Sequence, residues 1–310
     1  MSPLRVPRTL VLSDLHLGRP NGAGRADAFE ALLADFDRVI VNGDVAELHH
    51  PEFAADAEIE LARLRDICFS RGIKLDLVAG NHDPFVSDVR SVTLAEGAIY
   101  VTHGDALHPA VAPWSPCASI MREAYAAALG ATPHGTPEDA ARFAAAREAS
   151  LAEWRAMGDG AHVSTIGGMA RHPLLAMSVV AYWSRYPQMV SSWVGRFAPQ
   201  AGTVIVGHSH RGFVRMVDGR QIVNTGAYSF PGRPTGVVVE GTTVRVHRLA
   251  KRGHLFALAQ DAVAAWPINF HARGLEQLPE RPEPGQASAA STPAMNRAAS
   301  PSASPSIDGR

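Results

Sequence analysis

The sequence predicts an α/β protein in which strands alternate with helices and a long helical segment interrupts the strands. Three observations support this prediction. Apolar runs of strand length recur through residues 8–102 and return after residue 202, segments with helical periodicity separate the early runs, and residues 107–200 are rich in Ala, Trp, Met and Tyr and look mostly helical. The chain has 310 residues, of which 46% are hydrophobic, so a sizeable core can form.

The elements of the first part follow in order. Residues 24–36 place apolar side chains on one helical face, and residues 52–71 form a longer helix that Gly72 closes. Buried-strand patterns predict four strands, over residues 8–13, 38–42, 73–79 and 98–102.

The second part begins with the helical segment. Residues 135–154 predict a helix that Thr136 caps and Pro137 starts. Residues 173–197 predict two helices broken at Pro187, because proline removes a backbone donor and clashes with the preceding turn. Strands then return over residues 203–207, 212–217, 220–225, 235–240 and 243–249, with hairpin turns at Asp218-Gly219 and Glu240-Gly241.

Three parts follow from this pattern. Residues 1–106 and 201–278 form a discontinuous core, and residues 107–200 form a helical insertion or lid. The segment 279–310 is rich in Pro, Ser and Ala and lacks the apolar content to pack, so we expect a disordered tail.

Composition narrows the class of partner. The net charge of −1 gives no basic footprint for nucleic acid, so no nucleic-acid partner is expected. No signal-peptide pattern and no spanning apolar segment is evident, and the two cysteines, Cys68 and Cys117, form no metal or redox motif. These features predict a cytoplasmic protein whose partner is a small molecule.

Side chains that often bind metals follow five of the predicted strands. In an α/β sheet, the carboxyl ends of the strands form the edge where ligands bind, so we expect these side chains to converge. They are Asp14 and His16 in "SDLH", Asp44 in "NGD", Asn81 in "GNHD", His103 in "THGD", and His208 and His210 in "GHSH".

This set of donors contains oxygen and nitrogen but no thiolate. Such donors suit Mn²⁺, Fe, Zn²⁺ or Co²⁺. Seven ligands are too many for one zinc-like ion, which takes about four, but they suffice for two ions if one carboxylate bridges. Two metals about 3.5–4 Å apart can clamp the attacking and leaving oxygens of a phosphoryl transfer.

The ordered motifs "DLH", "GD", "GNHD", "HGD" and "GHSH" resemble those of the calcineurin-like metallophosphoesterases. The resemblance implies a four-layer α/β-β/α metallophosphoesterase sandwich with a helical insertion. It also implies two divalent metal ions, with Mn²⁺ expected first and Fe, Zn²⁺ or Co²⁺ as alternatives. In that scheme Asp14, His16 and His210 hold one ion, Asn81, His103 and His208 hold the other, and Asp44 bridges them.

The same scheme gives each residue of "GNHDP" a role. Gly80 lets the chain turn sharply, and Asn81 offers its amide oxygen to the metal. His82 is left free beside the substrate as a catalytic proton donor. Asp83 is expected to hydrogen-bond His82, fixing its tautomer and favouring its charged form.

Within the superfamily, "SDLHLG" followed by "NGD" and the helical insertion is similar to the UDP-2,3-diacylglucosamine diphosphatases. Those enzymes split the pyrophosphate of a lipid A precursor, and the insertion covers the acyl chains. That branch carries an arginine at the position of His82. The histidine of this chain matches the pattern of the wider superfamily. We therefore expect a hydrolase in which a metal-bridging hydroxide cleaves a phosphoester or pyrophosphate bond. Lipid-linked and nucleotide-sugar compounds are both candidate substrates.

Several residues around the motifs have less specific predictions. Arg19 and Arg211 are candidates for binding phosphate, although either could be a solvated surface arginine. His49 and His50 follow Asp44 closely and are expected on the surface rather than at the pocket rim. Aromatic residues of the insertion could contact a membrane surface or could pack the insertion's own helices. The alternative function is an inactive scaffold of the same fold that binds protein partners.

Overall fold

The computed structural model describes residues 6–157, 173–229 and 232–275. All the described residues belong to the first of the two units into which the chain divides, which spans residues 1–278. The tail that we predict to be disordered lies outside the described residues. None of the helices in the described ranges combines the length and apolar character needed to cross a bilayer.

Two sheets form the centre of the first unit. One has six strands in the order β11-β10-β9-β1-β2-β3, and the other has five in the order β4-β5-β6-β8-β7. Strands β1, β2 and β3 are parallel, and so are β5, β6 and β8, so each sheet brings several carboxyl ends to one edge. The strands are β1 (Arg8–Leu12), β2 (Arg38–Asn42), β3 (Lys74–Val78), β4 (Ser91–Leu94), β5 (Ile99–Thr102), β6 (Thr203–Val206), β7 (Phe213–Val217), β8 (Arg220–Asn224), β9 (Thr235–Glu240), β10 (Thr243–Arg252) and β11 (Leu255–Pro267).

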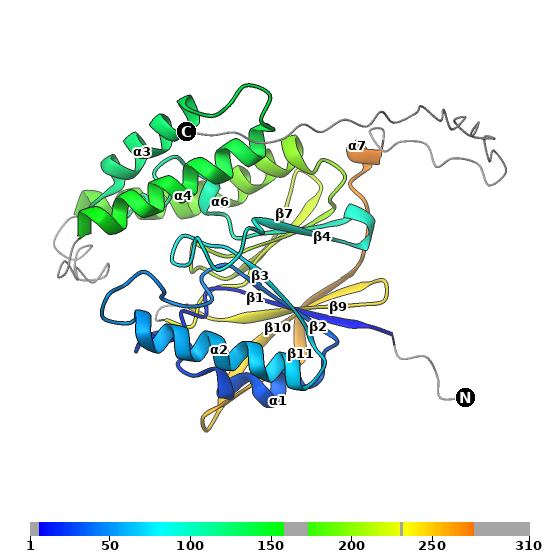
Figure 1. Cartoon of the computed structure of the whole chain (residues 1–310). Helices are drawn as coiled ribbons and strands as arrows, with labels where there is room; N and C mark the ends of the chain where they lie inside the picture. Colours follow the sequence, from blue (N-terminus) through cyan, green and yellow to red (C-terminus); the bar gives the residue numbers. More distant parts are fainter. Residues whose placement is uncertain (1–5, 158–172, 230–231, 276–310) are drawn as a thin grey trace, which may run out of the picture. The chain divides into compact units, whose positions relative to one another are not determined.

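Helices cover the outer faces of both sheets (Figure 1). On the six-stranded sheet lie α1 (Glu30–Leu33) and α2 (Ala54–Ser70), preceded by the short 3-10 helix η1 (Ala26–Phe29). On the five-stranded sheet lie α3 (Ala118–Gly130), α4 (Glu138–Met157) and α6 (Pro173–Phe197). Shorter elements are η2 (Ala95–Gly97), η3 (Asp105–Leu107) and α7 (Ala272–Leu275).

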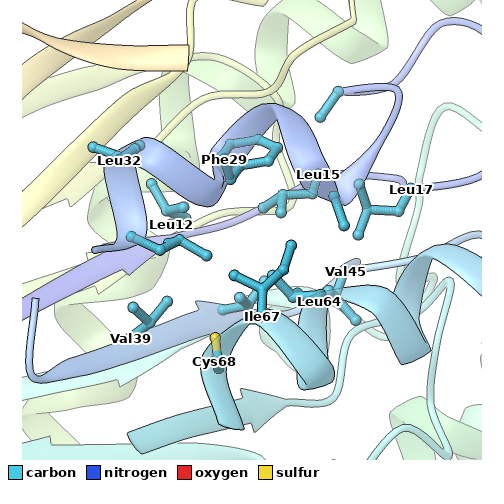
Figure 2. Close-up of a cluster of buried hydrophobic side chains, with 14 of the residues drawn as sticks. Leu12, Leu15, Leu17, Phe29, Leu32, Val39, Val45, Leu64, Ile67 and Cys68 are labelled. Carbon is cyan, nitrogen blue, oxygen red and sulfur yellow. The ribbon is translucent and has the colours of Figure 1, made fainter. Parts of the chain in front are cut away.

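Three apolar clusters fill the three spaces between these layers. The first joins the six-stranded sheet to its helices through residues such as Leu12, Phe29 and Leu64, and Figure 2 shows it with the Cys68 thiol among them. The second joins the two sheets through residues such as Ile40 and Ile205. The third packs α3, α4 and α6 on the five-stranded sheet. The α/β fold class with two packed sheets and outer helices is therefore confirmed.

The third cluster shows how the segment 107–200 is held. Tyr186 of α6 is fully buried in the same cluster as Tyr100, Val204 and Ile222, which lie on the five-stranded sheet. The helices of this segment therefore form the outer layer of that sheet. The boundary that we draw between core and insertion at residue 106 remains a prediction.

Several elements differ from the sequence-based expectation. The helix predicted over 24–36 is two short pieces, η1 and α1, and the strands β4 and β11 were not predicted. Strand β11 has the sequence LFALAQDAVAAWP, in which alanine gives little strand preference. It exists because it pairs with β10, a contact between neighbouring segments that periodicity alone does not reveal.

The predicted break at Pro187 is wrong, because α6 runs continuously from Pro173 to Phe197. Anchors just before the proline hold this helix on the loop after β6. The Trp183 Nε1 group donates to the Ser209 carbonyl at 3.1 Å, and the Tyr186 hydroxyl donates to the Gly207 carbonyl at 3.0 Å. We attribute the intact helix to this tertiary packing, which outweighs the local preference of proline to end a helix.

Replacing Tyr186 with phenylalanine should lower the free energy of unfolding by about 0.5–1.5 kcal/mol, because the variant loses the hydrogen bond to Gly207. Urea unfolding measures this change. Tyr182→Phe is the matched control, since the buried Tyr182 hydroxyl has no hydrogen-bond partner among the described residues, so that its removal should be neutral or stabilising. Equal losses in the two variants would contradict the assignment.

Candidate metal centre

The loops after β1, β2 and β6 are tied together at the edge of the two sheets. The Asp14 amide donates to the Gly43 carbonyl at 3.1 Å, and the His16 amide donates to the Asp44 carbonyl at 2.9 Å. The His208 amide donates to Asp14 Oδ1 at 2.9 Å. These bonds bring three segments that are distant in sequence to one place.

Backbone strain is concentrated at this edge. Among the described residues other than glycine, nine have a positive φ, and five of the nine are predicted metal ligands. Such conformations are uncommon for non-glycine residues and cost about 1–3 kcal/mol each, so they persist where function requires a particular side-chain direction. The five are Asp14 (φ 53°), His16 (46°), Asp44 (52°), His208 (65°) and His210 (58°).

Two glycines allow the loops to approach each other closely. Gly43 has φ 79°, and a Cβ there would lie 2.2 Å from His103 Nδ1. A Cβ at Gly80 would lie 2.2 Å from Asp44 Oδ1. Gly80 does not have a positive φ, so it serves the close approach of Asp44 rather than the sharp turn we expected.

All seven predicted ligands meet in two groups that share Asp44. One atom each of Asp14, His16, Asp44 and His210 lie within 4.8 Å of one another, and so do atoms of Asp44, His103 and His208. The Asn81 Oδ1 atom joins the second group, at 2.9 Å from His208 Nδ1 and 3.3 Å from His103 Nε2. The role of these residues as metal ligands remains a prediction.

Three of the histidines are oriented by acceptors outside the cluster. Each donates one ring N–H outward, so that its other ring nitrogen faces the cluster. Outer acceptors of this kind fix the tautomer and direction of metal-binding histidines. They are Glu47 Oε2 for His16 Nδ1 (3.0 Å), the Asn42 carbonyl for His103 Nδ1 (2.9 Å) and the Val111 carbonyl for His208 Nε2 (3.0 Å).

Two further observations fit a bound cation. With its hydrogen on Nε2, a neutral His208 presents Nδ1 as an acceptor, and this atom faces another acceptor, Asn81 Oδ1, at 2.9 Å. The buried Asp44 Oδ2 atom lies 3.2 Å from His103 Nε2 and 3.8 Å from His16 Nε2. A divalent ion satisfies facing acceptors and a buried carboxylate oxygen, so the donors present fit such an ion.

Charges in the cluster move several pKa values. Burial acts to raise the pKa of Asp44, but the neighbouring His103 and His82 outweigh it and hold that pKa well below its usual value. Burial acts to lower the pKa of His103, but Asp44 and Asp14 raise it to about 10. Burial and the charge of His103 lower the pKa of His208 to about 4, which keeps that ring neutral.

The partner of His82 is Glu47, a residue that the sequence reasoning missed. His82 Nδ1 lies 2.6 Å from Glu47 Oε1, and the other oxygen of the same carboxylate accepts from His16. Glu47 is buried and stands three residues after Asp44. The signal available in the sequence was a carboxylate that follows the apolar pair Val45 and Ala46 at a strand end.

The prediction of a hydrogen bond between Asp83 and His82 is therefore wrong. The buried Asp83 carboxylate instead accepts from backbone amides, including those of Gly80 at 2.8 Å, Asp44 at 3.2 Å and Val45 at 2.5 Å. Asp83 joins the loop after β3 to the loop after β2 and so holds Asp44 in place.

His82 lies beside the cluster of candidate metal ligands with a quarter of its side chain exposed. Burial acts to lower the pKa of His82, but the charges of Glu47 and Asp44 raise it to about 9. Because Nδ1 faces Glu47, Nε2 is the ring nitrogen that takes no part in this ion pair.

The other predicted residues lie at the rim. Arg19 donates to Glu47 at 3.4 Å and has 39% of its side chain exposed. Arg211 is exposed, and its guanidinium lies 5.7 Å from the centre of the Trp183 ring. His49 is half-buried and hydrogen-bonds the His82 carbonyl at 2.8 Å, so the surface position expected for it is wrong.

Comparison with known proteins gives one family and a set of distant structures. The family description "Calcineurin-like phosphoesterase" matches residues 7–212. Comparison with curated proteins gives no match.

Similar solved structures include a dimetal phosphatase from Danio rerio, with 12% identity and a TM-score of 0.44, covering 86% of this chain and 100% of that one. The phosphoesterase Yfce from E. coli has 14% identity and a TM-score of 0.39, covering 84% and 100%. A single mutant of Vps29 from Entamoeba histolytica has 10% identity and a TM-score of 0.40, covering 83% and 99%.

The family match covers more than half of the chain and includes every residue of the two side-chain groups described above. The chain belongs to the calcineurin-like phosphoesterase family.

Proposed function

We propose that this chain is a metal-dependent hydrolase that cleaves a phosphoester or pyrophosphate bond. The observation that carries the proposal is the orientation of three buried histidines around one carboxylate. His16, His103 and His208 each donate one N–H outward and turn the other nitrogen toward the cluster that contains Asp44. Metal-binding histidines show this arrangement.

The geometry supports two ligand sets. Asp14, His16 and His210 would hold one ion, Asn81, His103 and His208 would hold the other, and Asp44, which belongs to both groups, would be shared. Divalent ions bound there would supply a water of lowered pKa and positive charge for the phosphoryl oxygens.

The remaining residues act on the substrate. Glu47 holds His82 Nδ1, which leaves Nε2 to donate a proton to the leaving oxygen. Arg19 lies against the same Glu47 carboxylate and is half-exposed, so that it can contact a phosphate oxygen at the rim. Arg211 occupies a second exposed position next to His210.

The helical layer supports a substrate with an organic body beyond its phosphate. The Trp114 ring lies 5.3 Å from the His208 ring, and Trp183 donates to the Ser209 carbonyl between the two histidines of "GHSH". Such aromatic side chains offer apolar surface beside the reacting group. We propose lipid-linked or nucleotide-sugar diphosphates as the substrates to test first.

The alternative of an inactive scaffold is not favoured. Each predicted ligand position holds a side chain that can bind a metal, and these side chains meet in one cluster. A fold that had lost its metals would have no need to keep five strained backbone positions there.

Loading the protein with Mn²⁺ should give about two ions per chain, as measured by elemental analysis after removal of free metal. The metal should also stabilise the fold, because a ligand that binds only the folded state adds about 2.7 kcal/mol per site at 100 times its Kd. Thermal unfolding with and without a chelator measures this effect. A metal content that never exceeds one ion per chain would exclude the two-ion site.

The activity itself is tested by a screen of the loaded protein. The substrates are p-nitrophenyl phosphate, its bis ester, cyclic nucleotides and nucleotide-sugar pyrophosphates. The metal-free protein is the control. Hydrolysis that requires metal supports the proposal, and inactivity on all of these substrates with both ions bound would count against it.

A further inference from the structure

Helix α4 contacts the rim of the metal cluster through Trp154. The indole of Trp154 stacks on the imidazole of His49, with ring centroids 3.5 Å apart and planes 8° apart. The Trp154 Nε1 atom is buried and has no hydrogen-bond partner among the described residues. The function proposed above assigns no role to this residue.

His49 connects Trp154 to the loop that carries His82. A carbonyl oxygen only accepts hydrogen bonds, so His49 Nδ1 is the donor in the 2.8 Å bond to the His82 carbonyl. The His49 and His82 rings lie 5.0 Å apart. On its other side the His82 ring meets Glu47, so His82 is held by its main chain through His49 and by its side chain through Glu47.

A second contact fixes the position of α4 over the same loops. Arg147 lies seven residues before Trp154, on the same face of the helix. Its guanidinium is 5.3 Å from the centre of the Phe85 ring and 3.6 Å from the Asp88 carboxylate. Helix α4 thus contacts the loop after β3 at Arg147 and the loop after β2 at Trp154.

We propose that Trp154 is a positioning residue for His82, acting through His49. The stacked indole fixes the plane of the His49 ring, and His49 fixes the carbonyl of His82 and thereby the direction of its side chain. The role of His82 as proton donor rests on the proposed function, but the coupling between Trp154 and the loop rests on the contacts alone. The helical layer would then contribute to leaving-group protonation as well as covering the sheet.

If Trp154 positions His82, the loss of rate on removing the indole should depend on the leaving group of the substrate. A displacement of about 1 Å at a catalytic group can reduce the rate by about 10²-fold. An alkoxide needs its proton, whereas nitrophenolate leaves readily without one. Loss of the Trp154 ring should therefore slow an alkyl phosphoester by about 10–100-fold and slow p-nitrophenyl phosphate less.

The experiment compares Trp154→Ala, Trp154→Phe and His49→Ala in the full-length, metal-loaded chain. The values of kcat/KM for an alkyl phosphoester and for p-nitrophenyl phosphate give the ratio of the two rates, and metal content and Tm are measured alongside. We expect the alanine variant at 154 to lower the ratio and the phenylalanine variant, which keeps a ring to stack, to restore most of it. Because both residues act through one contact, the double alanine variant should lower the ratio no further than either single variant.

Trp193→Phe in α6 is the matched control. This tryptophan is buried against Phe143 and Phe197, so its change should alter Tm without changing the ratio of the two rates. Equal slowing of both esters by Trp154→Ala, no recovery in Trp154→Phe, or additive effects in the double variant would each overturn the proposal.

A measurement that needs no activity separates this inference from the proposed function. The His82 amide donates to Asp44 Oδ1 at 2.9 Å, so its hydrogen exchange reports on the order of the loop. Trp154→Ala should speed exchange in residues 80–84 while leaving the strands protected. If the unaltered chain hydrolyses neither ester, the proposed function fails, and the exchange result alone decides the coupling: unchanged exchange in residues 80–84 would overturn it.

Discussion

Asp44→Asn should reduce kcat/KM by roughly 10²–10⁴-fold, because a shared carboxylate contributes to both ions and several kcal/mol of transition-state stabilisation depend on them. Asp44 is the one residue common to the two clusters, and its Oδ2 atom lies 3.2 Å from His103 Nε2. Steady-state kinetics and elemental analysis on the same preparation test the prediction. We expect metal content to fall together with activity.

The control for this variant is Asp76→Asn. Asp76 lies in β3, the neighbour of β2. Its carboxylate accepts from Arg38 Nε at 2.6 Å, and this ion pair is not part of the cluster. The change removes the same charge and should leave activity and metal content unaltered. Full activity in Asp44→Asn, with both ions still bound, would rule out Asp44 as the shared ligand.

His82→Ala should slow hydrolysis of an alkyl phosphoester by roughly 10²–10⁴-fold, which is the usual contribution of a general acid. The effect on p-nitrophenyl phosphate should be smaller, since its leaving group departs without a proton. Metal content should not change, because His82 is not a ligand in the proposed scheme. The comparison requires kcat/KM for both substrates together with elemental analysis.

Two variants sharpen this result. Glu47→Gln removes the charge that holds His82 Nδ1 and should produce the same dependence on the leaving group, with a loss of about 10–100-fold that is typical of outer-shell partners. His254→Ala alters an exposed histidine in the turn between β10 and β11 and should have no effect. Because His82 also clusters with His16 and Glu47, loss of metal in His82→Ala would identify His82 as a ligand and end its assignment as the acid.

The sequence alone was sufficient to predict the layered α/β class, most strands and the convergence of seven donors. Parallel strands place their carboxyl ends at one edge, so a donor that follows a short apolar run is already located in space. Periodicity over a few residues defines such runs, and β2 (Arg38–Asn42) and β9 (Thr235–Glu240) begin and end where we expect.

Only the tertiary structure decided which groups touch. The sequence places Asp83 next to His82, yet adjacent side chains at a strand end point in different directions, and Asp83 accepts from the backbone of the neighbouring loop. Glu47 reaches His82 across 35 positions of sequence because the loops after β2 and β3 lie side by side.

The same reason explains the continuous α6 and the position of His49. Pro187 weakens a helix locally, but hydrogen bonds from Trp183 and Tyr186 to the loop after β6 hold that helix from outside. His49 lies at the rim because Trp154, more than a hundred residues later, stacks on it. Local patterns determine the elements and the edge where the donors gather. The partner of each donor is determined by hydrogen bonds and ring contacts between distant segments, and no local pattern encodes those contacts.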